Sequence, residues 1–154
     1  GNTQTVAETL AKKLNVDKSD IFDVANTSLS KINEYDVALL GSSTWGIGDL
    51  QDDWDTNPLS DLSLAGKQIG VFGAGDSSSY ADSFCDAIGI LAEAAVKAGA
   101  TLIGNKVETA DYTYDESVAV VDGYFCGLPI DEDNESDQTD ERIEKWVAAL
   151  KESI

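Results

Sequence analysis

Three short segments of the chain combine glycines, small polar side chains and aromatic rings in a way that could hold a flat, phosphorylated ligand. Residues 1–3 are Gly-Asn-Thr before a helical pattern, and free backbone N–H groups at a helix start suit a phosphate. Residues 43–48 carry the large ring of Trp45 among small residues. Residues 73–80 end in a second ring, Tyr80, after glycines that allow a close backbone approach. Each segment alone is better explained as a helix cap or a ring packed on its own domain. Together they predict a slot for a flat ring that carries a phosphate.

The elements that must position these segments alternate between buried strands and amphipathic helices. The expected strands are residues 21–24, 36–41, 68–73 and 101–104. The expected helices are residues 3–14, a helix with an apolar stripe at 84–95 that Gly99 stops, and a last helix with an apolar stripe at 143–154. A helical turn is expected at 50–54, and Ser136 or Asp137 is expected near the cap of the last helix. Such alternation predicts an α/β fold with a doubly wound parallel sheet. Ligands of these sheets bind at the carboxyl ends of the strands, where the three segments lie.

One segment interrupts this alternation. Residues 106–124 are polar and contain tyrosines, and they separate the strand at 101–104 from a second apolar run at 125–130. We expect an insertion here that splits the last strand. A length of 154 residues suits one hydrophobic core, so residues 1–154 are expected to form a single domain.

The charge of the chain is one-sided, with 29 acidic and 10 basic residues and a net charge of −19. Such a field repels nucleic acid and attracts basic proteins, although solubility alone explains it equally well. The chain has no histidine, which removes the usual general base and the usual zinc ligand. Any chemistry is therefore expected to come from a bound cofactor, without a metal site.

Apolar runs and cysteines bear on where the protein works. The longest apolar runs, such as 37–40 and 90–96, are shorter than the ~20 residues needed to cross a bilayer. No membrane insertion is therefore expected. Cys85 and Cys126 lie far apart in apolar stretches and are expected to be buried thiols in a reducing compartment. This favours the cytoplasm.

Four longer stretches carry a more specific pattern. They are residues 44–54 (TWGIGDLQDDW), 75–87 (GDSSSYADSFCDA), 127–134 (GLPIDEDN) and 139–147 (TDERIEKWV). Together they resemble the signatures of flavodoxins, and the resemblance runs from residue 1 to residue 154. The split last strand matches the long-chain subgroup of that family. The resemblance implies the flavodoxin-like strand order 2-1-3-4-5.

The resemblance also implies one FMN, bound without a covalent bond. The residues that would bind it are Gly1, Asn2, Thr3, Thr44, Trp45, Gly46, Ile47, Gly75, Asp76, Tyr80 and Asp133. Residues 1–3 would hold the phosphate, with Thr44 near it. Trp45 would cover the inner face of the isoalloxazine and Tyr80 the outer face, while the loop backbones bond the polar edge of the ring. Asp133 would contact the ribityl chain, or is simply one of many solvated acids.

By the same resemblance, the protein is a low-potential one-electron carrier and not a catalyst by itself. A negative shell around a dianionic phosphate disfavours further negative charge on the ring, which makes the reduced cofactor a strong electron donor. The expected partners are basic-faced redox proteins such as a ferredoxin/flavodoxin–NADP reductase. The protein is expected to be a monomer.

Three alternatives remain open from the sequence. An FMN-dependent NAD(P)H or quinone reductase of the same fold would need basic residues near the aromatic loops, and these loops contain none. A phosphoacceptor signalling domain would need an aspartate at the end of the third strand, where this chain has Gly41, Ser42 and Ser43. The last alternative is a domain of this fold that binds no flavin.

The chain departs from the family pattern in two places. Flavodoxins begin with an apolar strand that runs into the phosphate loop, whereas this sequence opens inside that loop. We therefore expect roughly ten further residues of strand character upstream. Residues 77–79 are three serines where relatives more often carry larger or amide side chains, so the loop before Tyr80 is expected to be looser.

Overall fold

The computed structural model describes residues 2–45, 49–50 and 62–154 of the chain. Its α-helices are α1 (Asn2–Lys13), α3 (Asp86–Lys97), α4 (Glu132–Glu135) and α5 (Thr139–Ser153). Its strands are β1 (Val37–Trp45), β2 (Asp49–Leu50), β3 (Gln68–Ala74), β4 (Thr101–Leu102), β5 (Val107–Glu108), β6 (Val120–Val121), β7 (Tyr124–Phe125) and β8 (Leu128–Ile130). Short 3-10 helices are η1 (Lys18–Asp20), η2 (Leu29–Glu34), η4 (Ala81–Ser83) and η5 (Ser136–Gln138).

A parallel sheet built around β3 forms the centre of the molecule. β1 runs beside β3 from Val37 opposite Gln68 to Ser43 opposite Ala74. β4 pairs with the start of β3, and β8 pairs with its end. Because residues 103–127 lie between β4 and β8, the last strand is split, as the sequence predicted. The short β2 pairs antiparallel with the end of β1.

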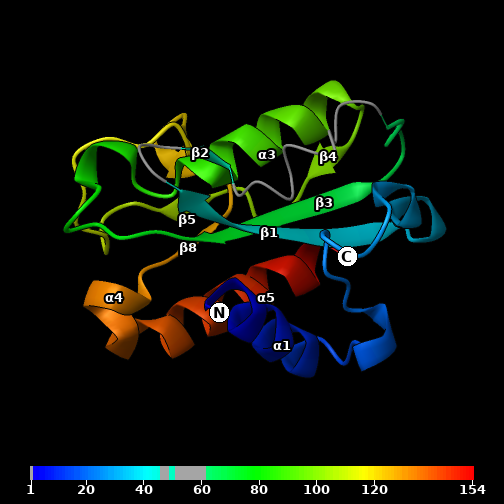
Figure 1. The fold of residues 1–154 in the computed structure, drawn as a ribbon, viewed down its shortest axis with the longest axis horizontal. Helices are drawn as coiled ribbons and strands as arrows, with labels where there is room; N and C mark the ends of the chain where they lie inside the picture. Colours follow the sequence, from blue (N-terminus) through cyan, green and yellow to red (C-terminus); the bar gives the residue numbers. More distant parts are fainter. Residues whose placement is uncertain (1, 46–48, 51–61) are drawn as a thin grey trace.

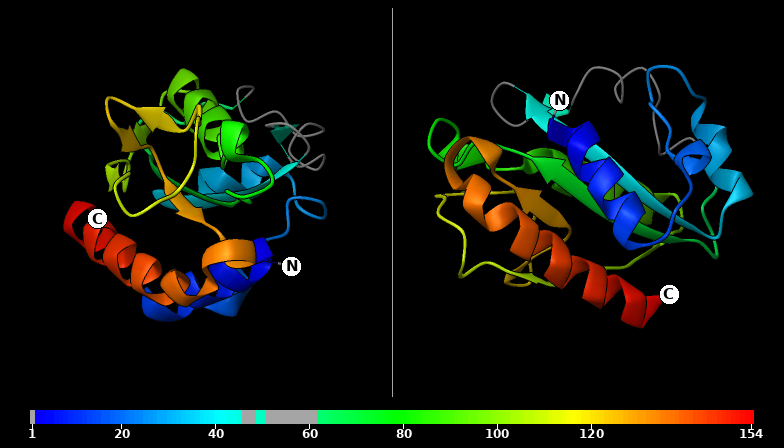
Figure 2. Two further views of the ribbon diagram at one scale, coloured as in Figure 1. Left: turned by 90° about the vertical axis from the view of Figure 1, so that its left-hand side faces the viewer. Right: turned by 90° about the horizontal axis from the view of Figure 1, so that it is seen from below.

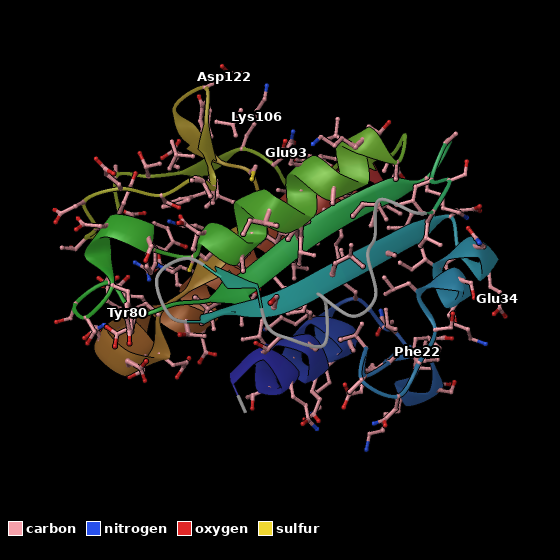
Figure 3. The ribbon with its side chains drawn as sticks, turned by 45° about the horizontal axis from the view of Figure 1, so that its top comes forward. Phe22, Glu34, Tyr80, Glu93, Lys106 and Asp122 are labelled. Carbon is pink, nitrogen blue, oxygen red and sulfur yellow. The ribbon has the colours of Figure 1, made fainter. Side chains whose placement is uncertain are left out.

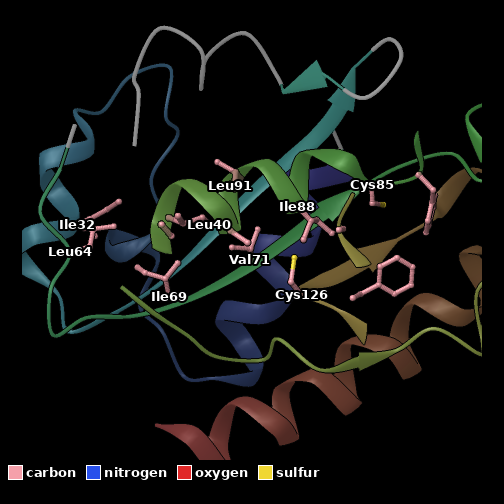
Figure 4. Packing of buried hydrophobic residues seen from close by; sticks show 14 of the residues in the cluster. Ile32, Leu40, Leu64, Ile69, Val71, Cys85, Ile88, Leu91 and Cys126 are labelled. Carbon is pink, nitrogen blue, oxygen red and sulfur yellow. The ribbon is translucent and has the colours of Figure 1, made fainter. Parts of the chain in front are cut away.

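Helices cover both faces of this sheet. α3 lies on one face, and α1 and α5 lie side by side on the other (Figure 1). Figure 2 shows the same three layers from the end and from below. On the α3 face, Ile88 and Leu91 pack in one buried cluster with Ile69 and Val71 of the sheet (Figure 4). Parallel strands buried on both faces explain the continuous apolar runs in the sequence.

The helix on the opposite face illustrates how spacing produces this packing. Ile143, Trp146, Val147 and Leu150 of α5 follow helical spacing, and all are buried. Burying a side chain of this size contributes about 1.5–3 kcal/mol each. The indole N–H of Trp146 donates to the Gly104 carbonyl at 2.8 Å. Tertiary burial therefore stabilises α5 more than its own helix propensity does.

The expected strand at residues 21–24 is wrong. This segment follows η1 and then turns, since the Asp23 carboxylate accepts the Ala25 N–H at 2.9 Å and the Asp23 carbonyl accepts the Asn26 N–H at 3.0 Å. Local bonding of this kind competes with a strand ladder. In the described part of the chain, β1 and β3 therefore correspond to the third and fourth strands of the expected order. β4 and β8 together correspond to the split fifth strand.

Two boundaries also differ from expectation. β4 ends at Leu102 because Gly104 takes a left-handed conformation with φ of +59° beneath Trp146. Ser136 and Asp137 do not cap the last helix, since both lie in η5. The helical turn expected at 50–54 falls largely outside the described residues; Leu50 itself belongs to β2.

The insertion forms a small sheet of its own, in the antiparallel order β5-β7-β6. Beneath it, the expected buried thiols are confirmed: Cys85 and Cys126 are buried and free. Burial raises the pKa of both thiols above its ordinary value. No helix in the described residues is long and apolar enough to cross a membrane.

Candidate functional site

The register of the parallel strands brings three loops together at one end of the sheet. Ser43 lies opposite Ala74, and Ala74 lies opposite Ile130, so the carboxyl ends of β1, β3 and β8 are level. The chain continues from them as residues 44–45, 75–80 and 131–134. The N-terminal end of α1 lies at the same end of the molecule (Figure 1). This is the edge where parallel sheets bind ligands.

The loop after β3 is held by the carboxylate of Asp76. Its Oδ1 atom accepts the backbone N–H groups of Ser78 at 3.0 Å and Ser79 at 2.9 Å. The same oxygen accepts the side-chain amide of Asn134 at 2.7 Å. The Ser79 N–H, followed by the Asn134 amide, holds the pKa of Asp76 below its ordinary value.

A second carboxylate, Asp131, lies beneath this loop and is fully buried. Its Oδ2 atom accepts the Ser77 N–H at 3.2 Å and also the Ser77 hydroxyl. Its Oδ1 atom accepts the backbone N–H of Asn134 at 3.1 Å and the side-chain amide of Asn134 at 3.0 Å. The three serines, which the sequence suggested would loosen the loop, are thus each bonded to a carboxylate. The N–H group of each serine donates a hydrogen bond to a carboxylate.

Tyr80 follows this loop and keeps a large part of its side chain in solvent. The side chain is 45% exposed, although the Tyr80 N–H donates to the Asp76 carbonyl at 2.9 Å and its carbonyl accepts the Ser83 N–H at 3.2 Å. Figure 3 places Tyr80 at the end of the molecule beside α4. A fixed backbone with an exposed ring suits stacking on a flat ligand.

The structure places the other residues of the predicted site as follows. Asn2 and Thr3 open α1, Thr44 and Trp45 close β1, and Gly75 connects β3 to the Asp76 loop. Asp133 is exposed on α4, and its carboxylate has no hydrogen bond or ion pair with the described residues. Gly1, Gly46 and Ile47 lie outside the described residues.

Two observations fit an FMN at this edge. The first turn of α1 carries no acidic residue, in a chain with 29 of them, so its N–H groups remain attractive to a phosphate. A Cβ at Gly75 would lie 2.7 Å from the Cys85 sulfur, so only glycine lets the chain leave β3 along this path. The Gly75 N–H donates to the Ile130 carbonyl at 3.0 Å, which joins the start of this loop to the end of β8.

Sequence reasoning missed three residues that hold this loop, namely Ser77, Asp131 and Asn134. The signal for Asp131 was present, because an acid directly after the buried run 125–130 must find donors. Nothing in the sequence identified Ser77 as one of those donors, since the two residues are 54 positions apart.

Comparison with known proteins agrees with this geometry. The family model described as Flavodoxin matches residues 1–146. A flavodoxin of Nostoc sp. is 41% identical over 153 residues, covering 98% of this chain and 89% of the relative. Flavodoxin 1 of Escherichia coli is 39% identical over 157 residues, covering 100% and 89%. The structure of Fusobacterium nucleatum flavodoxin bound to flavin mononucleotide superposes with a TM-score of 0.89 at 28% identity, covering 99% of this chain and 91% of that one. The resemblance to flavodoxins is thereby confirmed at the level of the family, and the chain belongs to the flavodoxin family.

Proposed function

We propose that this protein holds one FMN without a covalent bond and carries single electrons between redox proteins, without being a catalyst by itself. The observation that carries the proposal is the meeting of an exposed Tyr80 ring, a carboxylate-held loop and the acid-free start of α1 at one sheet edge. The F. nucleatum relative is bound to flavin mononucleotide. In this family fold, the bound flavin supplies the electron chemistry.

The residues of this chain would bind and orient the cofactor. The N–H groups at the start of α1, with Asn2 and Thr3, would hold the phosphate. Tyr80 would stack on the outer face of the ring, and Trp45, at the end of β1, on the inner face. The backbone around Gly75 and Asp76 would form hydrogen bonds with the polar edge of the ring. The net charge of −19 would oppose added negative charge on the ring and keep its reduction potential low.

The experiment compares FMN binding by the parent protein, Tyr80→Ala and Tyr124→Ala. Tyr124 is also exposed, at 40%, but lies in the insertion and serves as the matched control. We expect visible flavin absorption in the parent and a weaker FMN affinity in Tyr80→Ala by about 1–3 kcal/mol, as for stacked bases. Equal affinities of the two variants would contradict stacking by Tyr80. A parent protein without flavin absorption after FMN addition would contradict the function itself.

Redox proteins are the partners of this family, and we propose that the partners of this protein present a basic face, as a ferredoxin/flavodoxin–NADP reductase would. The supporting feature is a pocket of about 450 Å³ beside the Tyr80 loop, lined by Asp82, Tyr114, Asp115, Glu116, Ser117, Val118 and Val120. Val118, which lines this pocket beside the acids, is 60% exposed. An apolar patch with acidic neighbours suits a partner with a complementary basic rim.

The partner proposal is tested by removing charge from the insertion. The double variant Asp115→Asn/Glu116→Gln is compared with Glu152→Gln, an exposed acid of α5. We expect the insertion variant to slow electron transfer from a basic reductase and to flatten the dependence of the rate on ionic strength, with flavin affinity unchanged. Identical salt dependence in both variants would move the docking surface elsewhere. Steady NADPH oxidation without any partner would instead favour the flavin reductase alternative.

Two further properties belong to this proposal. We place the protein in the cytoplasm, since Cys85 and Cys126 are free thiols. We also propose that residues 1–154 act as a single, monomeric domain, because copies with a net charge of −19 repel one another.

A further inference from the structure

We propose that Asp131 is a positioning residue, whose carboxylate fixes the loop before Tyr80 in the conformation that receives the flavin ring. The inference rests on the proposed function, because the loop meets FMN only if the protein binds it. Its mechanical part, the fixing of the loop, stands on this structure alone.

The Asp131 carboxylate joins two segments that are distant in the sequence. It accepts the Ser77 N–H and hydroxyl from the loop after β3, and the Asn134 backbone and side-chain N–H groups from α4. The residue is 0% exposed. A buried carboxylate is tolerated only when such donors surround it, so removing side-chain donors from either segment weakens what compensates for the buried charge.

Asn134 extends this arrangement to the rest of the loop. Its side-chain amide bonds Asp131 at 3.0 Å and Asp76 at 2.7 Å. Asp76 in turn holds the N–H groups of Ser78 and Ser79. The carboxylates of Asp76 and Asp131 thus accept the N–H groups of all three serines, and the side-chain amide of Asn134 connects these two carboxylates. We call these residues, Asp76, Ser77, Asp131 and Asn134, the loop latch.

The loop latch reaches Tyr80 through the backbone of Asp76. The Tyr80 N–H donates to the Asp76 carbonyl at 2.9 Å, so the position of Asp76 determines the position of the Tyr80 backbone, from which the ring extends. A loop ordered before the ligand arrives loses less conformational freedom on binding. The latch therefore allows a loop of three small serines to hold the stacking residue, Tyr80, in a defined position. Its loss would change both flavin affinity and the contact that tunes the reduction potential.

Four variants separate the effect of the Asp131 charge from the effect of loop position. Ser77→Ala and Asn134→Ala each weaken the latch, by removing the hydroxyl donor to Asp131 or the amide that connects Asp131 to Asp76, and both leave the net charge unchanged. Asp131→Asn breaks the latch and removes one charge, while Asp137→Asn removes one charge from an exposed site in η5 that is not part of the latch. The readouts are the FMN dissociation constant, the one-electron midpoint potentials, and the circular dichroism of the bound flavin. A fourth readout, amide hydrogen exchange at residues 77–80, is made on flavin-free protein.

We expect Ser77→Ala and Asn134→Ala each to weaken FMN binding about three- to tenfold, which is the size of one ordinary hydrogen bond. We also expect both to shift the midpoint potentials, alter the flavin dichroism and speed exchange at residues 77–80, whereas Asp137→Asn does not alter exchange or dichroism. If only Asp131→Asn moves the potentials, the effect is one of charge and the proposal fails. Unchanged exchange in Ser77→Ala and Asn134→Ala would also overturn it. Because exchange is measured without FMN, a parent protein that binds no flavin contradicts the function but still tests the latch.

Discussion

The hydroxyl of Tyr112 offers a quantitative test of how the insertion is joined to the sheet. It donates to the Pro129 carbonyl at 2.8 Å in a buried setting, and the residue is 9% exposed. The ring packs edge-on against Phe125 at 5.0 Å, and the Arg142 guanidinium lies 3.8 Å from its centre. Tyr112→Phe keeps these ring contacts and removes only the donor. The Pro129 carbonyl then stays buried without its partner.

Leaving such a carbonyl unsatisfied costs about 1–3 kcal/mol. In a chain of this length, each kcal/mol shifts the melting temperature by about 2–4 °C. A cost of about 2 kcal/mol therefore lowers the melting temperature by roughly 4–8 °C. Burial raises the pKa of Tyr112 far above its ordinary value, so the hydroxyl remains a donor throughout the neutral range. The drop should therefore be the same at pH 6 and pH 8.

The assay is thermal unfolding followed by far-ultraviolet circular dichroism, with Tyr124→Phe as the control. Tyr124 lies in the same insertion, but its side chain is 40% exposed, so its variant should melt with the parent. Equal melting temperatures for Tyr112→Phe and Tyr124→Phe would refute the reasoning. They would mean that water or a shift of the backbone satisfies the Pro129 carbonyl.

Two further predictions concern backbone conformation and pH. Gly104→Ala should destabilise the protein more than Gly123→Ala in urea unfolding. Both glycines have positive φ, so alanine at either position costs about 1–2 kcal/mol of backbone strain. A Cβ at Gly104 would also lie 2.4 Å from the Trp146 Nε1 atom, whereas a Cβ at Gly123 would meet nothing within 4 Å. Equal losses of stability in the two variants would contradict the packing argument. The hydrogen bond to Asp20 raises the pKa of Tyr35 to about 12. The folded protein therefore keeps a proton that the unfolded chain releases above pH 10, and this stabilisation should be lost as pH rises from 10 to 12. Besides the still later Tyr112, ultraviolet titration should show a tyrosine near pH 12 that shifts toward pH 10 in Asp20→Ala, and an unchanged titration would exclude Asp20 as the cause.

Much of the framework was predictable because it depends on local patterns. The apolar runs at 36–41 and 68–73 became β1 and β3, and helical spacing predicted α1, α3 and α5 closely. The segment at 21–24 shows the limit of this reasoning. Its apolar residues resemble a strand, but the Asp23 carboxylate bonds a neighbouring N–H and turns the chain.

The sequence by itself determined the fold class, the family and the ligand-binding edge, because apolar periodicity, charge and short motifs are properties of neighbouring residues. Tertiary structure alone decided what holds that edge. Asp131 reaches Ser77 only because β8 pairs with β3 in a register that sets Ile130 opposite Ala74. No local pattern encodes that register, since it depends on how the two faces of the sheet bury their side chains together.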